Sequence, residues 1–255
     1  MSTPLFYVGL HQPSDARHFD LAFISVNRLR QRKSPFVAGR WIMDSGAFTE
    51  VSTHGGYRHS VAEYAEQIRR WAHVGQLEAA VAQDYMCEPW IVAKTGLSVE
   101  EHQRLTVERY DALVAEDLPV PILPVLQGYR PSDYVRHLHA YGDRLRPGMW
   151  VGVGSVCKRN GRPEEVAAVL EAIKRERPDL RLHGFGLKKT ALLHPAVRDL
   201  LHSADSMAWS FSARRGGRNG NDWREAKAFE RQVTDAARMP FAPWQMNLPM
   251  MGAVA

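Results

Sequence analysis

Short runs of apolar residues recur along the chain, and the later ones are separated by segments with helical periodicity. A continuous apolar run bounded by turn residues is typical of a buried strand. We expect eight strands, over residues 5–10, 21–26, 41–44, 77–83, 121–126, 149–153, 182–185 and 204–208.

Amphipathic segments between the strands predict helices. The segment 60–73 repeats apolar residues such as Tyr64 and Ile68 at spacings of three and four, which places them on one helix face. Another segment begins at Ser98 with Glu101 three residues later, a capping-box pattern. The expected helices cover residues 60–73, 98–116, 131–141, 162–176, 194–203 and 222–237.

The alternation of strands and helices implies parallel strands joined by right-handed crossovers. About eight strands in 255 residues fit a closed barrel in one domain. We therefore expect an α/β protein, a single (β/α)8 TIM-like barrel over residues 1–238 with an extended tail over 239–255. An open parallel sheet stays the alternative, because the chain has no Gly-rich dinucleotide fingerprint that would decide the strand order.

The composition is that of an ordinary globular protein. Cys87 and Cys157 stand far apart and form no CxxC pair, which excludes a disulfide framework and fits a reducing cytosol. No window approaches the roughly 18 apolar residues that a membrane span needs, and the chain begins without a basic and apolar leader. We expect a cytoplasmic protein, bacterial or phage-encoded, that does not act in a membrane.

Polar residues follow or end most of the expected strands, and in a barrel such positions line the active site. Carboxylates, a carboxamide and glycine-backed amides at one opening suit a polar heterocycle, because glycine lets a flat ligand approach the backbone. The alternative is structural: a strand-end aspartate can cap the next helix, and DSG or QGY can be turns. The strand-end residues are Asp44, Asp84, Gln127, Gly154, Ser155, Gly184, Gly186 and Asp205.

The ordered motifs resemble those of the tRNA-guanine transglycosylase superfamily, above all its short DNA-modifying branch, the DpdA-like enzymes that install 7-deazaguanines in DNA. The motifs are DSGAF, a mid-chain aspartate, LQGY, GVGS, HGFG and ADSMAWS followed by RNG, over about residues 44–221. The resemblance implies a barrel, a glycosyltransferase (pentosyltransferase) activity that exchanges guanine for a base such as preQ0, a covalent glycosyl-aspartate and no cofactor.

The same resemblance implies a role for each matching residue. Asp44 is the candidate proton-transferring group, and Asp205 lies in the segment of the nucleophile that attacks the sugar C1′. The chemistry fits, because a carboxylate can meet the charge that develops at C1′ while a second acid/base group serves the leaving and incoming bases. The candidate base-binding residues are Asp84, Gln127, Gly154, Ser155 and Gly184.

Two departures from the superfamily affect the substrate and the nucleophile. The tRNA enzymes bind zinc through three cysteines and a histidine, which two cysteines cannot supply, so we expect no metal site and no RNA-binding extension. DNA is then the more probable partner than tRNA. The nucleophile segment of the family has two aspartates three residues apart, and Ala208 stands at the later position. We prefer Asp205 as the nucleophile, with Asp44 as the alternative.

The formal net charge is +5, and basic residues cluster in three loops that follow strands. Such loops would neutralise backbone phosphates and give salt-dependent affinity, whereas the alternative is an ordinary solvated surface. The candidate nucleic-acid contacts are Lys158, Arg159, Lys188, Arg214, Arg215 and Arg218.

Three functions stay open. The first, which we prefer, is a DNA guanine transglycosylase. The second is a tRNA-guanine transglycosylase or a deazapurine nucleoside hydrolase, although a hydrolase of free nucleosides needs no basic loops. The third is a non-catalytic nucleobase- or nucleic-acid-binding barrel that works with partner proteins, and the shifted nucleophile is its best argument.

Overall fold

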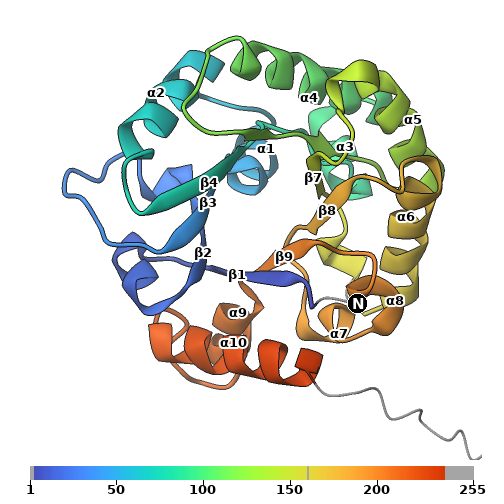
Figure 1. The fold of residues 1–255 in the computed structure, drawn as a ribbon. Helices are drawn as coiled ribbons and strands as arrows, with labels where there is room; N and C mark the ends of the chain where they lie inside the picture. Colours follow the sequence, from blue (N-terminus) through green and yellow to red (C-terminus); the bar gives the residue numbers. More distant parts are fainter. Residues whose placement is uncertain (1–2, 160, 239–255) are drawn as a thin grey trace, which may run out of the picture.

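The computed structural model describes residues 3–159 and 161–238, and it shows a ring of strands surrounded by helices (Figure 1). All the hydrogen-bonded strand pairs in this part of the chain are parallel, as the alternating pattern predicts. The strands are β1 (Leu5–Gly9), β2 (Leu21–Ser25), β3 (Arg40–Asp44), β4 (Gln76–Val81), β5 (Ile122–Leu123), β6 (Val125–Leu126), β7 (Trp150–Val153), β8 (Arg181–Gly184) and β9 (Ser203–Ser206).

The fifth expected strand is divided at Pro124 into β5 and β6, which gives nine strands in place of eight. Proline has no N–H for a sheet ladder, and its carbonyl accepts a hydrogen bond from the Gly152 amide at 2.8 Å. β5 pairs with β4 and β6 pairs with β7, so one segment joins the two edges of the sheet. The order β5-β4-β3-β2-β1-β9-β8-β7-β6 thus makes a nearly closed barrel, and the predicted α/β TIM-like fold is confirmed.

Helices surround the barrel, and two of them begin as the sequence predicts. Ser60 and Ser98 accept hydrogen bonds from the third helical residue in capping boxes at the starts of α2 and α4. The helices are α1 (Ala47–His54), α2 (Val61–Trp71), α3 (Pro89–Thr95), α4 (Val99–Val114), α5 (Pro131–Tyr141), α6 (Pro163–Glu176), α7 (Lys189–Leu192), α8 (Pro195–Arg198), α9 (Ala208–Arg215) and α10 (Trp223–Arg238).

Several elements differ from the expected ones. Within the described residues, the first two crossovers contain the 3-10 helices η1 (Pro13–His18) and η2 (Val26–Arg28) in place of α-helices. The helix expected over 194–203 is reduced to α8, since the chain enters β9 at Ser203. The strand expected over 204–208 stops at Ser206, because α9 begins at Ala208.

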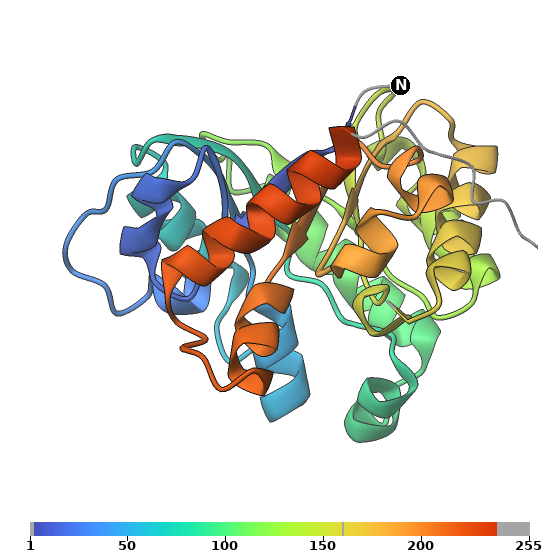
Figure 2. The same ribbon diagram turned by 90° about the horizontal axis from the view of Figure 1, so that it is seen from below.

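Three of the four short helices that the sequence did not predict, α1, α3 and α9, follow directly after strands or strand-end loops. Figure 2 shows all three protruding on the side of the barrel away from the N-terminus, which is the side where the parallel strands end. They therefore form part of the barrel mouth. The expected tail, residues 239–255, lies outside the described residues.

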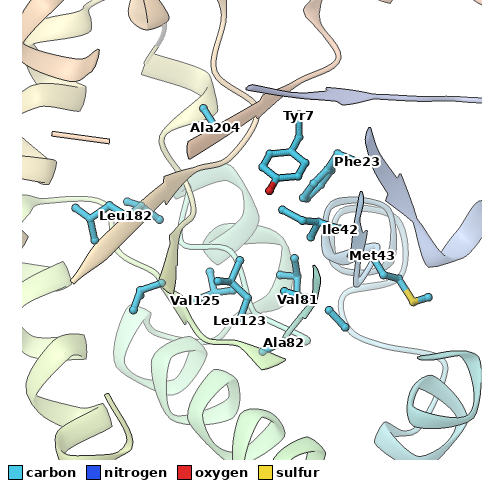
Figure 3. Packing of buried hydrophobic residues seen from close by; sticks show 14 of the residues in the cluster. Tyr7, Phe23, Ile42, Met43, Val81, Ala82, Leu123, Val125, Leu182 and Ala204 are labelled. Atoms are coloured by element: carbon cyan, nitrogen blue, oxygen red, sulfur yellow. The ribbon is translucent and has the colours of Figure 1, made fainter. Parts of the chain in front are cut away.

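Apolar side chains fill the barrel interior below the mouth. Figure 3 shows Tyr7, Phe23, Ile42, Val81 and Leu123 pointing into it from five different strands. These residues are buried and belong to one large hydrophobic cluster. A filled interior leaves the mouth, at the carboxyl ends of the strands, as the place for a site.

Candidate active site

A cavity of about 580 Å³ opens at the barrel mouth, and its size suits a small ligand such as a heterocyclic base. Its wall is built by the last residues of several strands and by the loops that follow them. Seven of the eight strand-end residues singled out from the sequence line this cavity together: Asp44, Asp84, Gln127, Gly154, Ser155, Gly186 and Asp205.

Asp44 is the last residue of β3, and the tight turn after the strand fixes its carboxylate. Oδ2 accepts a hydrogen bond from the Gly46 amide at 3.1 Å. Gly46 has φ +77, and a side chain there would collide with the Asn27 amide, so glycine is required in this turn. Burial in the cavity and the nearby Asp205 charge raise the pKa of Asp44 to about 6. Part of the Asp44 population is therefore protonated near neutral pH.

Asp84 follows β4 and is paired with a carboxamide. Gln127 Nε2 donates a hydrogen bond to Asp84 Oδ2. A carboxylate only accepts, so the Gln127 nitrogen faces Asp84 and the Gln127 oxygen faces away, where it accepts from Ser155 Oγ at 2.7 Å. Burial raises the pKa of Asp84 to about 7, although the Gln127 hydrogen bond opposes this rise and Asp44 adds to it. Asp84 can thus present either a donor or an acceptor to a base.

Gly154 leaves the space that the Gln127 carboxamide occupies. A Cβ atom on Gly154 would lie 2.1 Å from Gln127 Nε2, far inside the contact distance, so only glycine leaves room for the amide. The backbone is held on both sides: the Gly154 amide donates to the Leu126 carbonyl at 2.9 Å, and its carbonyl accepts from Tyr134 Oη at 2.7 Å. GVGS therefore positions the Gln127 amide.

Ser155 and Glu88 extend the polar wall of the cavity. Ser155 has φ +53, a conformation that L side chains rarely adopt, and its Oγ accepts from the Cys87 amide at 2.9 Å. Ser155 Oγ also lies 2.9 Å from Glu88 Oε2, so its single hydrogen serves Gln127 or Glu88 at one time. Glu88 was missed by sequence reasoning; the available signal was a carboxylate four residues after Asp84, before the proline that starts α3.

Asp205 lies in β9 and is held from two sides. Its Oδ1 accepts from the Gly186 amide at 3.0 Å and lies 3.3 Å from Nε2 of His183 on the neighbouring strand β8. The described residues supply these two hydrogen-bonding groups to Oδ1, which orients the carboxylate at the cavity wall.

A directed chain of hydrogen bonds ends on Asp205. Trp150 Nε1 only donates, and it reaches Ser203 Oγ at 2.8 Å. Ser203 Oγ lies 2.9 Å from His183 Nδ1, and Asp205 at the far end only accepts when ionised. A neutral His183 therefore accepts from Ser203 and donates from Nε2 to Asp205. His183 is fully buried between aromatic rings, including a stacked Phe23, and was also missed from the sequence, where it appears as one histidine in an apolar strand.

Gly184, expected at the base, lies outside the cavity wall. A side chain there would meet Leu187 at 2.6 Å and Leu201 at 3.3 Å, so this position faces the hydrophobic layer outside the strand. Phe185 and Gly186 line the cavity in its place. Ala208, the position of the later aspartate in the superfamily, begins α9 and is also outside the wall, whereas Asp205 is in it.

The basic candidates differ in exposure. Arg159 is buried, donates to the Tyr129 carbonyl and stacks on the Tyr129 ring at 4.6 Å, so its guanidinium supports the loop and does not face solvent. Arg214 and Arg215 are exposed on α9, and Arg218 is exposed and paired with Glu225 at 3.0 Å. The exposed Lys188 precedes α7, whereas the side chain of Lys158 lies outside what the structure describes.

The described residues contain neither a metal-binding cluster nor a membrane-spanning helix. Over residues 3–159 and 161–238, no group of three or more His, Cys, Asp or Glu side chains is arranged to hold a metal ion. Cys87 and Cys157 form no disulfide in the part of the chain that the structure describes. None of the helices described is long and apolar enough to cross a bilayer.

The fold and the site define an α/β barrel with a carboxylate- and amide-lined cavity at its carboxyl end. The family model described as DpdA, DeoxyPurine in DNA protein A, matches residues 2–224, which include every strand and all the cavity residues described above. The chain therefore belongs to the DpdA family, as its motifs predict. A comparison with curated proteins gave no match.

Proposed function

We propose that this protein is a DNA guanine transglycosylase, which replaces guanine in DNA with a 7-deazaguanine base such as preQ0. One observation supports this most directly: the oriented Asp205 carboxylate shares a base-sized cavity with Asp44 and with the Asp84–Gln127 pair. Membership of a family described by deoxypurines in DNA supports DNA as the polymer.

In the first half of the reaction, Asp205 attacks the sugar C1′ of the target nucleotide. The C1′–N9 bond to guanine breaks as the C1′–oxygen bond to Asp205 forms, and the leaving guanine takes up a proton. Asp44, with a pKa raised to about 6, supplies that proton. The Gly186 amide and His183 hold Oδ1 of the nucleophile during the attack.

In the second half, the incoming deazapurine replaces guanine in the same cavity. Its N9 loses a proton to the Asp44 carboxylate and attacks C1′, and the bond from C1′ to Asp205 breaks. Two displacements give overall retention at C1′. The proton that Asp44 gave to guanine is thereby recovered, so the cycle is balanced.

The edge of the base is recognised by groups that the structure places side by side. A guanine-like edge presents N–H donors beside a carbonyl, and Asp84 supplies the acceptor for those donors. The Gln127 amide and the Ser155 hydroxyl fix the orientation of Asp84 and complete the polar wall. Because these side chains already bond one another, they are arranged for the base before it binds.

The test is an exchange assay with labelled preQ0 and duplex DNA, single-stranded DNA or tRNA. We expect label in DNA, and we expect Asp205→Asn to reduce exchange by at least about a thousandfold while base binding persists. Asp199→Asn is the matched control, since Asp199 is exposed and paired with Arg198 away from the cavity.

A denaturing gel of wild type with DNA alone should show a protein–DNA adduct that Asp205→Asn cannot form. Labelled tRNA with unlabelled DNA would assign the alternative substrate. Free base released without exchange would indicate a hydrolase. Full activity in Asp205→Asn would make Asp205 the wrong nucleophile.

A further inference from the structure

The exposed aromatic residues gather at one end of the molecule. Among the described residues, six large hydrophobic side chains are exposed, and four of these are aromatic. We call these four the aromatic rim: Phe48, Trp90, Tyr129 and Phe211. Phe48 follows β3, Trp90 lies after β4, Tyr129 follows β6 and Phe211 lies after β9, so all four are at the mouth end. The two exposed aliphatic residues, Val37 and Val114, precede β3 and β5, at the opposite end.

The aromatic rim lies at the mouth end of the barrel, outside the core, and reaches the cavity at Phe48. Phe48 itself lines the cavity and meets Trp90 edge to face at 6.3 Å, which connects α1 with α3. On the other side, Met207 lines the cavity immediately before α9, the helix that presents Phe211. Figure 2 shows α1, α3 and α9 protruding together at this end.

Positive charge accompanies the aromatic rim. The Arg215 guanidinium lies 5.8 Å from the Phe211 ring, and Arg214 is exposed beside it on α9. At Phe211 the rim thus combines a flat apolar face with an exposed cation, a pair that matches a nucleobase and its phosphate.

We propose that the aromatic rim is a binding site for unpaired nucleobases, and that the DNA bound at the mouth is locally single-stranded on both sides of the target nucleotide. This inference rests on the proposed function and narrows its substrate. The target base enters the cavity, and its neighbours stack on the rim, Phe48 and Trp90 on one side and Phe211 on the other. Duplex DNA stacks its bases on one another and leaves no base face for these rings.

Position favours DNA over a protein partner at this surface. Rings and arginines also occur in protein interfaces, but here they lie at the mouth of a base-sized cavity in a member of the DpdA family. Stacking on such rings tolerates any base sequence, because every base has a π face.

The experiment is a binding assay that needs no catalysis. A labelled oligodeoxynucleotide is titrated as a single strand and as a duplex, with wild type, Trp90→Ala and Phe211→Ala. We expect tighter binding of the single strand, and each rim variant should weaken it about five- to a hundredfold while duplex binding changes little. Val37→Ala and Val114→Ala are matched controls with no expected effect. Trp90→Phe keeps a ring face, so it should bind nearly as wild type and shows that loss of the ring, not misfolding, weakens Trp90→Ala.

The salt dependence separates the two parts of the surface. Rim variants should leave the slope of affinity against salt unchanged, whereas Arg214→Gln should reduce it, because only the arginine meets a phosphate. Equal affinities for single strand and duplex, or rim variants that bind as wild type, would overturn the inference. If single strands bind through the rim but no base is exchanged, the proposed function is wrong and the rim inference stands. If rim variants exchange bases on duplex DNA at the wild-type rate, the rim inference is wrong and the proposed function stands.

Discussion

The carboxylates at the two ends of the barrel have different kinds of partner. At the amino end, Glu78 in β4 accepts from Tyr7 Oη at 2.6 Å and from Arg40 Nε at 2.9 Å, beside a second cavity of about 440 Å³. At the mouth, Asp44 and Asp84 form no ion pair with any lysine or arginine among the described side chains. Glu78 thus has a cationic partner, whereas the cavity carboxylates Asp44 and Asp84 have none among the described side chains.

This difference separates a carboxylate that connects strands from carboxylates that can take part in a reaction. A carboxylate that accepts from a cation and a hydroxyl connects the segments that carry those donors. A buried carboxylate beside another carboxylate has a raised pKa, which suits a group that must give and take a proton near neutral pH. Glu78 joins β1, β3 and β4, whereas Asp44 and Asp84 are arranged for a ligand.

The largest expected effect comes from exchanging charge for an amide at each end. Asp44→Asn removes the proton-transferring group, so exchange should fall about a hundred- to ten-thousandfold with little loss of thermal stability. Glu78→Gln should do the reverse, because it removes the charge opposite the half-exposed Arg40: we expect a loss of about 1 kcal/mol in the free energy of unfolding and exchange near the wild-type rate. Steady-state kinetics and denaturant unfolding of both variants measure the two effects. The proposed difference between the two ends is wrong if Glu78→Gln is folded but has lost exchange activity, or if Asp44→Asn retains exchange activity.

A smaller effect is expected from the group that holds the nucleophile. His183→Phe keeps a ring among Phe23, Phe185 and Trp150 but removes the donor to Asp205. By analogy with partners that orient metal ligands, we expect kcat to fall about ten- to a hundredfold with KM nearly unchanged.

Two further variants sharpen this reading. His183→Gln can still donate an N–H to Asp205 and should retain more activity than His183→Phe. Trp150→Phe removes only the hydrogen bond to Ser203, which is the one farthest from Asp205, and should reduce activity least of the three. An equal loss of activity and stability in all three would mean that His183 only packs the core.

The sequence could predict the barrel and the residues at its mouth for one physical reason. Strands buried on both faces are apolar, so the polar residue that ends each run stands out, as Asp44 does after β3. Side-chain direction could not be read in the same way. Gly184 and Gly186 are two residues apart in one motif. Gly186 has φ +62 and its amide donates to Asp205, whereas Gly184 faces the hydrophobic layer outside the strand.

Partners from distant segments were equally inaccessible to sequence reasoning. Arg159 looked like a phosphate contact, but its burial depends on Tyr129, thirty residues away in a different loop. His183 acquires its role only because β8 and β9 are in register, with His183 opposite Ser203. The split of the fifth strand at Pro124 likewise follows from barrel closure, since the two halves pair with different neighbours.

The smallest expected effect is the pH dependence of stability, and its sign distinguishes the two kinds of carboxylate. The pKa of Asp44 is raised to about 6 and that of Asp84 to about 7, so the folded protein binds more protons than the unfolded chain between about pH 4 and pH 7. Their contribution to stability is therefore present at low pH and lost as pH rises through the folded values. Solvent that reaches the open cavity screens these charges, so we expect the free energy of unfolding to fall by about 1–2 kcal/mol over this window.

The double variant Asp44→Asn/Asp84→Asn should flatten this fall, as measured by denaturant unfolding at pH 5 and pH 8. Glu50 is the matched contrast, because Arg58 lowers its pKa to about 2 and its contribution is lost only as pH falls below about 4.5. If the double variant and wild type lose stability in parallel from pH 5 to pH 8, the mouth carboxylates are not the strained groups that the comparison requires.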